Sequence, residues 1–498
     1  MTMISRVFGL VRDMVIAYFF GAGAGADVFF LAFRIPNLFR RLFAEGAFAQ
    51  SFVPVLSEYK EKRSKAETRD LIAKVSGTLG VNLVLITLLG VVGAEVVISV
   101  FAAGFVYNNQ VEKLALATDM LRLTFPYLLL ISMTAFSGAI LNTFGRFAAP
   151  AITPVLLNIS LILSAVFLRE HLEVPVMALA WGVLIAGVAQ LTFQLPFLAS
   201  EHVLPRPKVD FKDEGVRKIF ALMLPALFGV SVGQINLLLD TVLASFLETG
   251  SISWLYYSDR LLELPLALFG ITIATVILPS LSREHANDSI AEFSETLNWA
   301  MRLVFVFGLP ATLGLIVLSE SLMTTLFYQG EITKRDVSMA SLSLMAYAAG
   351  LLGHMLVKVL APGYFSRQDT KTPVKYGIVA LVSNMVLNLL LVWQFKHMGL
   401  ALATSLSAFI NAGLLFYGLI KSGKLEITSG WAIFFVRVIF ASSLMVAVLV
   451  LITPSSSVWF SFLLWERFGV MLLICAAGAL TYVAALVATG YKFRDAIR

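Results

Sequence analysis

Charged residues are scarce in this chain. Asp, Glu, Lys and Arg make up 14% of the 498 residues, whereas 59% are hydrophobic and the mean hydropathy is +0.87. Soluble domains carry about 25% charged residues, so the composition excludes an ordinary water-soluble fold. No polar segment is much longer than about 20 residues, which is too short to fold a core of its own and excludes a soluble catalytic domain. We predict an all-α polytopic membrane protein.

Cysteine and histidine are also rare. The single cysteine, Cys475, lies in an apolar run, so no intramolecular disulfide can form. Of the five histidines only His354 falls in an apolar segment, and no spacing resembles a metal site. The glycine patterns at 21–25 and 229–233 resemble nucleotide-binding and nucleophile motifs but lack the strands that such sites require. We therefore predict that the protein is not an enzyme.

Apolar segments long enough to cross a bilayer recur along the whole chain. A spanning helix needs about 20 mostly apolar residues, and this criterion predicts about fourteen spans. One of them, 27–57, is interrupted by Pro36, Gly46 and Pro54 and is predicted to be a broken helix. The predicted spans are 3–20, 27–57, 72–101, 118–144, 150–168, 175–198, 218–246, 253–281, 291–318, 337–362, 374–395, 398–420, 431–453 and 461–490.

Basic residues are shared unevenly between the two alternating sets of loops. One set holds most of them, including those at 60–69, 206–218 and 367–375, whereas the other has few, among them Lys113 and Lys396. The positive-inside rule then places both termini in the cytoplasm. The net charge of +6 is explained by this topology, so we predict no nucleic-acid partner.

The two halves of the chain resemble each other. Residues 12–34 align with 239–261, which places Asp13 over Asp240. We predict a repeated six-helix unit, with an N-terminal lobe at 1–200, a C-terminal lobe at 201–425 and two extra helices at 426–498. Parallel repeats of this kind build transporters whose lobes rock around a midplane site. Chance similarity between apolar spans is the alternative.

Ionisable side chains lie inside the predicted spans. Each costs roughly 2.5 to 3.5 kcal/mol on insertion scales, so such groups persist only when they face water, a partner or a substrate. We expect them to line a cavity. The set comprises Arg6, Arg12, Asp13, Arg34, Arg40, Arg41, Glu45, Asp259, Arg260, Glu263 and Lys358.

Arginine predominates in this set, and its planar guanidinium suits bidentate contact with phosphate oxygens. The predicted cavity therefore fits a phosphate-bearing anion. Internal ion pairing, of Arg12 with Asp27 and of Arg260 with Glu263, is the alternative. Anion binding and internal ion pairing are compatible if the acids orient the arginines. Arg41 has the further alternative of extending to the cytoplasmic interface.

A second group of polar side chains lies at membrane depth. Asp240, Asn384, Asn388 and Thr404 carry the carboxylate, amide and hydroxyl oxygens that hard cations prefer, so they form a candidate sodium site. Hydrogen bonding between helices is the alternative. No other cofactor is predicted.

Several motifs resemble the MurJ (MviN) lipid II flippase family, which belongs to the superfamily that also holds MATE drug exporters. They are SRVFGLVRD at 5–13, RIPNLFRRLFAEGAFAQSFVPVLSEYK at 34–60, FPYLLLIS at 125–132, AILNTFGRF at 139–147, SWLYYSDRLLELP at 253–265 and VKVLAPGYFSRQDTKTPVK at 357–375. The resemblance covers nearly the whole chain.

The resemblance implies two six-helix lobes, with the last two helices forming an apolar groove for a polyprenyl tail. It implies that Arg6, Arg12, Asp27, Arg40, Arg260 and Glu263 are the substrate-binding charges, with Arg41, Glu45, Asp259 and Lys358 in support. It also implies a sodium site at Asp240, Asn384 and Thr404, although Asn388 stands where an aspartate serves in relatives.

The implied function is outward transport of lipid II, the undecaprenyl-pyrophosphate-linked peptidoglycan precursor, across the bacterial cytoplasmic membrane. Membrane lipid and wall-synthesis enzymes are the other expected partners. Three alternatives stay open: a MATE-type exporter of organic cations, an exporter of another lipid-linked oligosaccharide, and a scaffold for wall-synthesis enzymes. An arginine-rich cavity would repel organic cations, which argues against the first.

Overall fold

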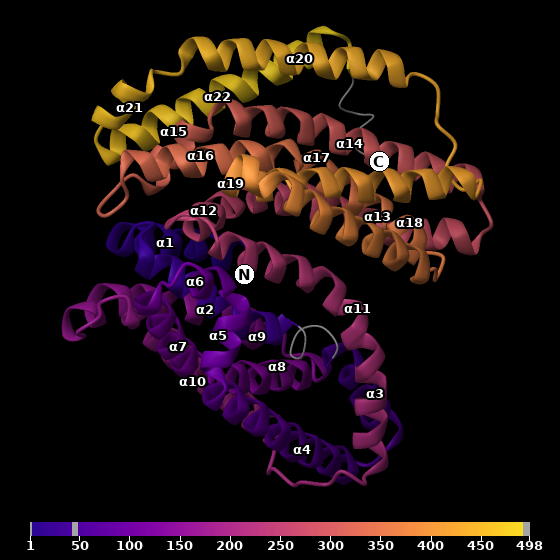
Figure 1. The fold of residues 1–498 in the computed structure, drawn as a ribbon. Helices are drawn as coiled ribbons and strands as arrows, with labels where there is room; N and C mark the ends of the chain where they lie inside the picture. The colour runs from indigo at the N-terminus through magenta and orange to yellow at the C-terminus, as the bar shows by residue number, and fades with distance from the viewer. Residues whose placement is uncertain (1, 42–47, 492–498) are drawn as a thin grey trace. The chain divides into compact units, whose positions relative to one another are not determined.

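A computed structural model describes the backbone of residues 2–41 and 48–491, and the side chains in those ranges except 2–4, 224–226 and 228–233 (Figure 1). Every regular element within these ranges is a helix. The predicted all-α membrane fold is therefore confirmed.

The chain forms two compact units, Met1–Ser253 and Trp254–Arg498. The elements that begin in the first unit are α1 (Thr2–Phe20), α2 (Ala24–Phe39), α3 (Phe48–Lys62), α4 (Lys65–Val92), α5 (Ala94–Phe101), α6 (Ala103–Tyr107), α7 (Val111–Thr124), α8 (Tyr127–Thr143), α9 (Ala148–Leu163), η2 (Ser164–Leu168), η3 (Arg169–His171), α10 (Met177–Ser200), α11 (Glu214–Ser245) and α12 (Ser251–Pro265).

Helix α12 continues into the second unit. The elements that follow it are η4 (Leu266–Ile271), α13 (Thr272–Ala286), α14 (Ile290–Val317), α15 (Ser319–Phe327), α16 (Lys334–Ala349), α17 (Leu351–Leu360), α18 (Pro362–Phe365), α19 (Lys371–Lys421), α20 (Trp431–Ile452), α21 (Ser456–Ser461) and α22 (Leu464–Ala488).

The helices account for every predicted span. Among the described residues ten helical runs are long and apolar enough to cross a membrane. One of them, α19, covers two predicted spans, and the backbone of Lys396 (φ 52°, ψ −132°) breaks the helix between them. The other three predicted spans correspond to α1, to α2 with α3, and to α11.

The prolines of the second predicted span do not break the helices that carry them. Pro36 lies inside α2 and Pro54 inside α3, while Gly46 is outside the described residues. A helix tolerates proline because neighbouring groups can satisfy the carbonyl that the ring leaves without a donor.

Side-chain caps fix where several helices begin. Ser64 and Glu67 form a reciprocal capping box at the start of α4, and Thr333 and Asp336 do the same for α16. Asp213 caps α11 through a 3.1 Å hydrogen bond from the backbone amide of Val216. These caps supply acceptors for backbone amides that have no partner inside the helix.

Helix α11 belongs to the first unit by its packing, where it lies against α3, α4, α5 and α6. The division predicted from the repeat placed this helix in a second lobe that starts at 201. Packing and internal repetition are different criteria, so the three-part division into 1–200, 201–425 and 426–498 stays a prediction.

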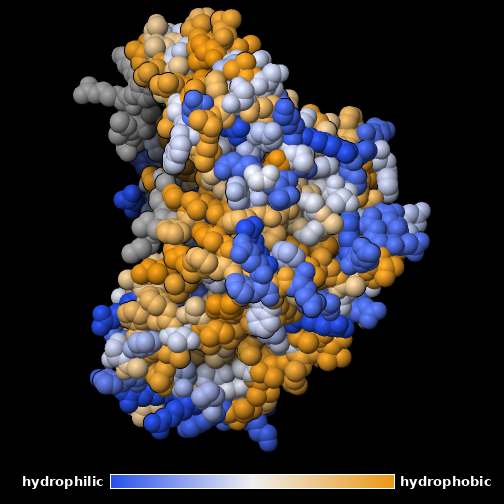
Figure 2. Space-filling model, turned by 90° about the vertical axis from the view of Figure 1, so that its left-hand side faces the viewer, coloured by the Kyte–Doolittle hydropathy of each residue, from blue (hydrophilic) through white to orange (hydrophobic). Residues whose placement is uncertain are grey.

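In the second unit α14, α20 and α22 enclose an apolar cluster that includes Val438, Trp459 and Leu486. Elsewhere large apolar side chains are exposed, for example Leu451, Trp465 and Leu473, each more than 70% accessible. Figure 2 shows hydrophobic residues spread over much of one face of the molecule. Water would penalise such a surface, whereas lipid matches it.

Candidate functional site

The predicted charged residues fall in both units. Arg6, Arg12, Asp27, Arg40 and Arg41 belong to the first, and Asp259, Arg260, Glu263 and Lys358 to the second. Glu45 lies outside the described residues.

Arg12 lies in the interior of the first unit, with 7% of its surface exposed. Its Nε and Nη2 donate to Oδ1 of Asp13 at 2.9 and 2.6 Å, and its Nη1 donates to Oδ1 of Asn158 at 3.0 Å. Asn158, on α9, also donates to the carbonyl of Ser5, which ties α9 to the start of α1. A buried ion pair of this kind is costly to break from one side, because the remaining charge is then uncompensated.

The ion pair of Arg12 with Asp27, which was the alternative for these charges, is not formed. Asp27 lies in the first turn of α2, 2% exposed, and accepts hydrogen bonds from three donors at the start of α12. These donors are the backbone amide of Gly250 (2.6 Å), the backbone amide of Ser253 (2.9 Å) and Oγ of Ser253 (2.6 Å). The amides at a helix start lack intrahelical partners and carry partial positive charge, which is why they attract this carboxylate.

Nearby contacts hold the same turn. Lys113 donates to Oγ1 of Thr249 at 2.5 Å, and Oγ of Ser245 accepts the amide of Gly104 at 2.9 Å. Gly104 is suited to this approach, because a Cβ there would lie 2.2 Å from the backbone of Ser245 and Phe246. The segment from Ser245 to Ser253 is thus anchored on α2, α6 and α7.

Arg34 of α2 and Arg40, which follows its last residue, also contact polar groups of the first unit. Arg34 donates to Oγ1 of Thr241 on α11 at 2.5 Å, and Arg40 donates to Oδ1 of Asn37 at 2.7 Å. Arg6, Arg40 and Arg41 are all partly accessible. Partly accessible guanidinium groups keep the capacity to take up an anion, since arginine stays charged under any ordinary condition.

In the second unit the alternative ion pair of Arg260 and Glu263 is formed, with 2.9 Å between Nη1 and Oε2. Arg260 also contacts the hydroxyl of Tyr256 at 3.2 Å, and its guanidinium lies over the Tyr256 ring. The pair is accessible, and Lys358 on α17 is exposed as well. This arrangement leaves the arginine oriented but reachable from outside.

Three of the four predicted sodium ligands meet in the second unit. Nδ2 of Asn388 donates to Oδ1 of Asn384 at 2.8 Å, and Nδ2 of Asn384 lies 3.5 Å from the hydroxyls of Thr404 and Ser407. Asp240 is buried in the first unit. The observed contacts are those expected for hydrogen bonding between the two halves of α19. Across the described residues no group of three or more His, Cys, Asp or Glu side chains could hold a metal ion.

Asn158, Thr241 and the Gly250–Ser253 turn were not predicted as partners of these charges. Asn158 carried a usable signal, because it is a lone amide within the apolar run 150–168. The turn carried none, since two of its three donors are backbone amides that look alike in any sequence, and the third is a serine hydroxyl.

Comparisons with known proteins agree with this architecture. The profile of the family described as Lipid II flippase MurJ matches residues 16–468. A "Probable lipid II flippase MurJ" of Vibrio cholerae is 52% identical over 500 residues, covering 99% of this chain and 95% of that protein.

Two solved structures are also similar. One, described as lipid II flippase MurJ in an inward closed conformation, has a TM-score of 0.81 at 27% identity and covers 100% of this chain and 98% of its own. A multidrug MATE transporter in an inward-facing conformation has a TM-score of 0.70 at 13% identity, covering 86% and 96%. The MATE likeness extends to the fold alone. The family profile and the near-complete alignment show that this chain is a multi-pass membrane transporter of the MurJ lipid II flippase family.

Proposed function

We propose that this chain carries lipid II from the inner to the outer leaflet of the cytoplasmic membrane by alternating access, with arginines binding the pyrophosphate. The single observation that carries the proposal is the set of oriented arginines inside apolar helices of a flippase-family chain, with Arg12 held by Asp13 and Arg260 held by Glu263. Arginine without a role at such depth would be selected against by its insertion cost.

The two arginines have different roles in this proposal. In the second unit Arg260 is partly exposed and contacts the pyrophosphate directly. In the first unit Arg6, Arg40 and Arg41, which are partly accessible, are the arginines assigned to substrate binding. Arg12 is buried and paired with Asp13, so it positions α1 against α9. Asp27 and Glu263 act as orienting acids, and Asp259 and Lys358 complete the charged surface of the second unit. The polyprenyl tail stays in lipid or in the groove of α20 and α22.

The proposed drive is the membrane potential. An inside-negative potential acts on each charge that crosses the membrane by about 2.3 kcal/mol per 100 mV, so it favours outward movement of the anion. The emptied, positively charged site is drawn back toward the cytoplasm by the same field. Collapse of the potential is expected to stall transport, and undiminished transport would refute the coupling.

The proposed topology has both termini in the cytoplasm, because the loops at 60–69, 206–218 and 367–375 are the basic ones. Wall-synthesis enzymes are the protein partners that we expect for this function. A cysteine-accessibility scan of single cysteines placed in these loops, in a Cys475→Ser background, tests the orientation.

Sodium coupling is a separate question. Asn384, Asn388 and Thr404 offer amide and hydroxyl oxygens, and Asp240 would have to supply the carboxylate. If sodium binds there, it raises the melting temperature of the wild type and leaves that of Asp240→Ala unchanged. An identical melting temperature in sodium and in potassium would sink the site.

The test of the transport proposal compares labelled lipid II exposed on the outer leaflet in cells that depend on this chain alone. Arg260→Ala is expected to abolish exposure while the protein stays folded in the membrane. Arg122→Ala is the matched control, because Arg122 forms an accessible ion pair with Asp119 on α7. Unchanged exposure in Arg260→Ala would make the arginines structural and favour the scaffold alternative.

A further inference from the structure

The linker between α10 and α11, residues 201–213, is docked on α4. The amide of Lys208 donates to the carbonyl of Ala73 at 2.9 Å, and the amide of Asp210 donates to Oγ1 of Thr78 at 3.1 Å. Gly77 permits this approach, since a Cβ there would lie 2.2 Å from the carbonyl oxygen of Lys208. We call this segment the docked linker.

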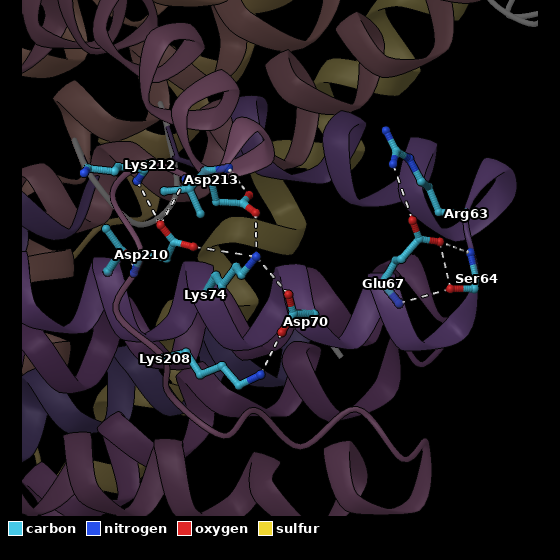
Figure 3. A network of polar contacts seen from close by, with 11 residues as sticks. Arg63, Ser64, Glu67, Asp70, Lys74, Lys208, Asp210, Lys212 and Asp213 are labelled. Atoms are coloured by element: carbon cyan, nitrogen blue, oxygen red, sulfur yellow. Dashed lines mark hydrogen bonds and ion pairs between the residues drawn. The ribbon is translucent and has the colours of Figure 1, made fainter.

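An ionic network reinforces the docking (Figure 3). Nζ of Lys74 lies 2.9 Å from Asp70, 2.8 Å from Asp213 and 3.7 Å from Asp210, and Nζ of Lys208 lies 2.8 Å from Asp70. The three acids are therefore engaged by Lys74 and Lys208. Lys218, farther along, is engaged by Glu58 at 2.7 Å, and that hydrogen bond and charge lower the pKa of the Glu58 carboxyl.

An apolar slot begins beyond this network. It has a volume of about 360 Å³, and its walls include Leu79, Leu83 and Ile86 of α4 with Phe220 and Met223 of α11. Its one polar lining residue is Asn82, whose amide donates to the carbonyl of Thr78. We call this cavity the α4–α11 slot.

The slot runs along the helices into their apolar part. With a rise of 1.5 Å per residue, Leu79 lies about 7.5 Å and Ile86 about 18 Å along α4 from Lys74. Phe220 lies about 10 Å along α11 from Asp213, whose carboxylate contacts Lys74. Both walls therefore lead from a polar end to an apolar end, which matches the polar headgroup and the apolar acyl chain of a phospholipid.

Two cations lie beside the polar end. Lys212 follows Phe211, which lines the slot and is 52% exposed, and Arg217 precedes Phe220 by one helical turn. Both side chains are exposed, and within the described part of the chain neither forms an ion pair. Between Lys212 and Arg217 the only acid not engaged by Lys74 is Glu214, so two positive charges face one negative charge in this part of the sequence.

We propose that the α4–α11 slot holds one acyl chain of a membrane phospholipid, whose phosphate is bound by Lys212 and Arg217. The slot matches an acyl chain in polarity, and the cations match a headgroup phosphate at the basic face of the membrane. This site lies within the first unit and is separate from the charges assigned to lipid II. The leaflet that supplies the phospholipid follows from the topology proposed above. Binding of the phospholipid does not depend on the transport proposal.

Photochemical labelling of the full-length protein tests the proposal. The protein is placed in phosphatidylcholine nanodiscs with a trace of phosphatidylglycerol that carries a diazirine on its acyl chain, and labelled peptides are mapped. Label is expected to concentrate at 79–86 and 220–223. In Lys212→Gln/Arg217→Gln this label should fall roughly tenfold, since each cation near a lipid surface contributes to binding. Lys371→Gln/Lys375→Gln, which removes two exposed lysines of α19, should keep it.

Three outcomes overturn the proposal. Label spread evenly over the lipid-facing helices means that the slot is empty of lipid. Equal labelling by a diazirine diacylglycerol, which lacks the phosphate, means that Lys212 and Arg217 bind nothing. Labelling by a diazirine polyprenyl phosphate that excess phosphatidylglycerol does not displace assigns the slot to another lipid. None of these results depends on lipid II transport, so failure here leaves the transport proposal standing.

Discussion

The carboxylate of Asp27 accepts the backbone amide of Gly250 across 2.6 Å, although 223 residues of chain separate them. The same carboxylate accepts the amide and the hydroxyl of Ser253. Asp27 thus caps a helix to which it does not belong, and its charge is matched to backbone amides instead of to arginine.

Replacing Asp27 by Asn should therefore destabilise the protein by about 1.5 to 3 kcal/mol, the range for losing a hydrogen bond to a charged group. An amide keeps one acceptor oxygen but turns a donor toward one of the backbone amides. Thermal unfolding in detergent measures the effect. Asp119→Asn, which alters an exposed ion pair on α7, should change the melting temperature little. Equal shifts in the two variants would contradict the capping role.

Arg12 and Asp13 should show strong coupling in a double-mutant cycle. Arg12→Ala or Asp13→Ala alone leaves one buried charge unmatched, which costs about 3 to 5 kcal/mol. The double variant removes both charges, so it should be less destabilised than the sum of the two single variants, and melting curves of the four proteins give the coupling. Additive effects would mean that Asn158, and not Asp13, holds the guanidinium.

Arg260 and Glu263 should behave in the opposite way. Because their ion pair is accessible, Glu263→Gln is expected to change stability by less than about 1 kcal/mol. Lipid II exposure should nevertheless fall, since Arg260 loses the partner that orients it. A melting temperature that falls together with exposure would indicate that this pair supports the fold and has no direct part in transport.

The docked linker gives a matched pair of glycine substitutions on α4. Gly77→Ala forces a Cβ into the backbone of Lys208 and should release the linker, whereas Gly80→Ala meets nothing within 4 Å. Gly80→Ala should be neutral or stabilising by up to about 1 kcal/mol, because alanine favours helix. The rate of limited proteolysis within 201–213 measures release of the linker, and it should rise in Gly77→Ala alone. Equal cleavage in both variants would show that the linker is not held by this contact.

Sequence reasoning reached the membrane-spanning helices because their signal is local. A run of apolar residues has to cross lipid as a helix whatever its neighbours are, and even the break near Lys396 follows from two separate apolar runs. The charged residues were also identifiable, because each of them stands out against an apolar background.

Partners in space were harder to predict. The pairing of Arg260 with Glu263 followed from their spacing on one helix, whereas Arg12 was matched to the wrong acid. The true arrangement depends on Asn158 and on the turn at Gly250, which only tertiary packing brings to α1 and α2. Lys74 and Gly77 were not singled out, because a lysine at a span end and a helical glycine are ordinary until the linker lies against them.

The packing of α11 on α3 and α4 has a consequence for synthesis of the chain in the cell. Helices α1 to α10 leave the ribosome before α11, so the surfaces of α3 and α4 that α11 covers are made first. Helix α11 itself, and the amides that Asp27 requires, arrive only with residues 214–253. The first unit therefore cannot reach its final packing during insertion of its own early helices.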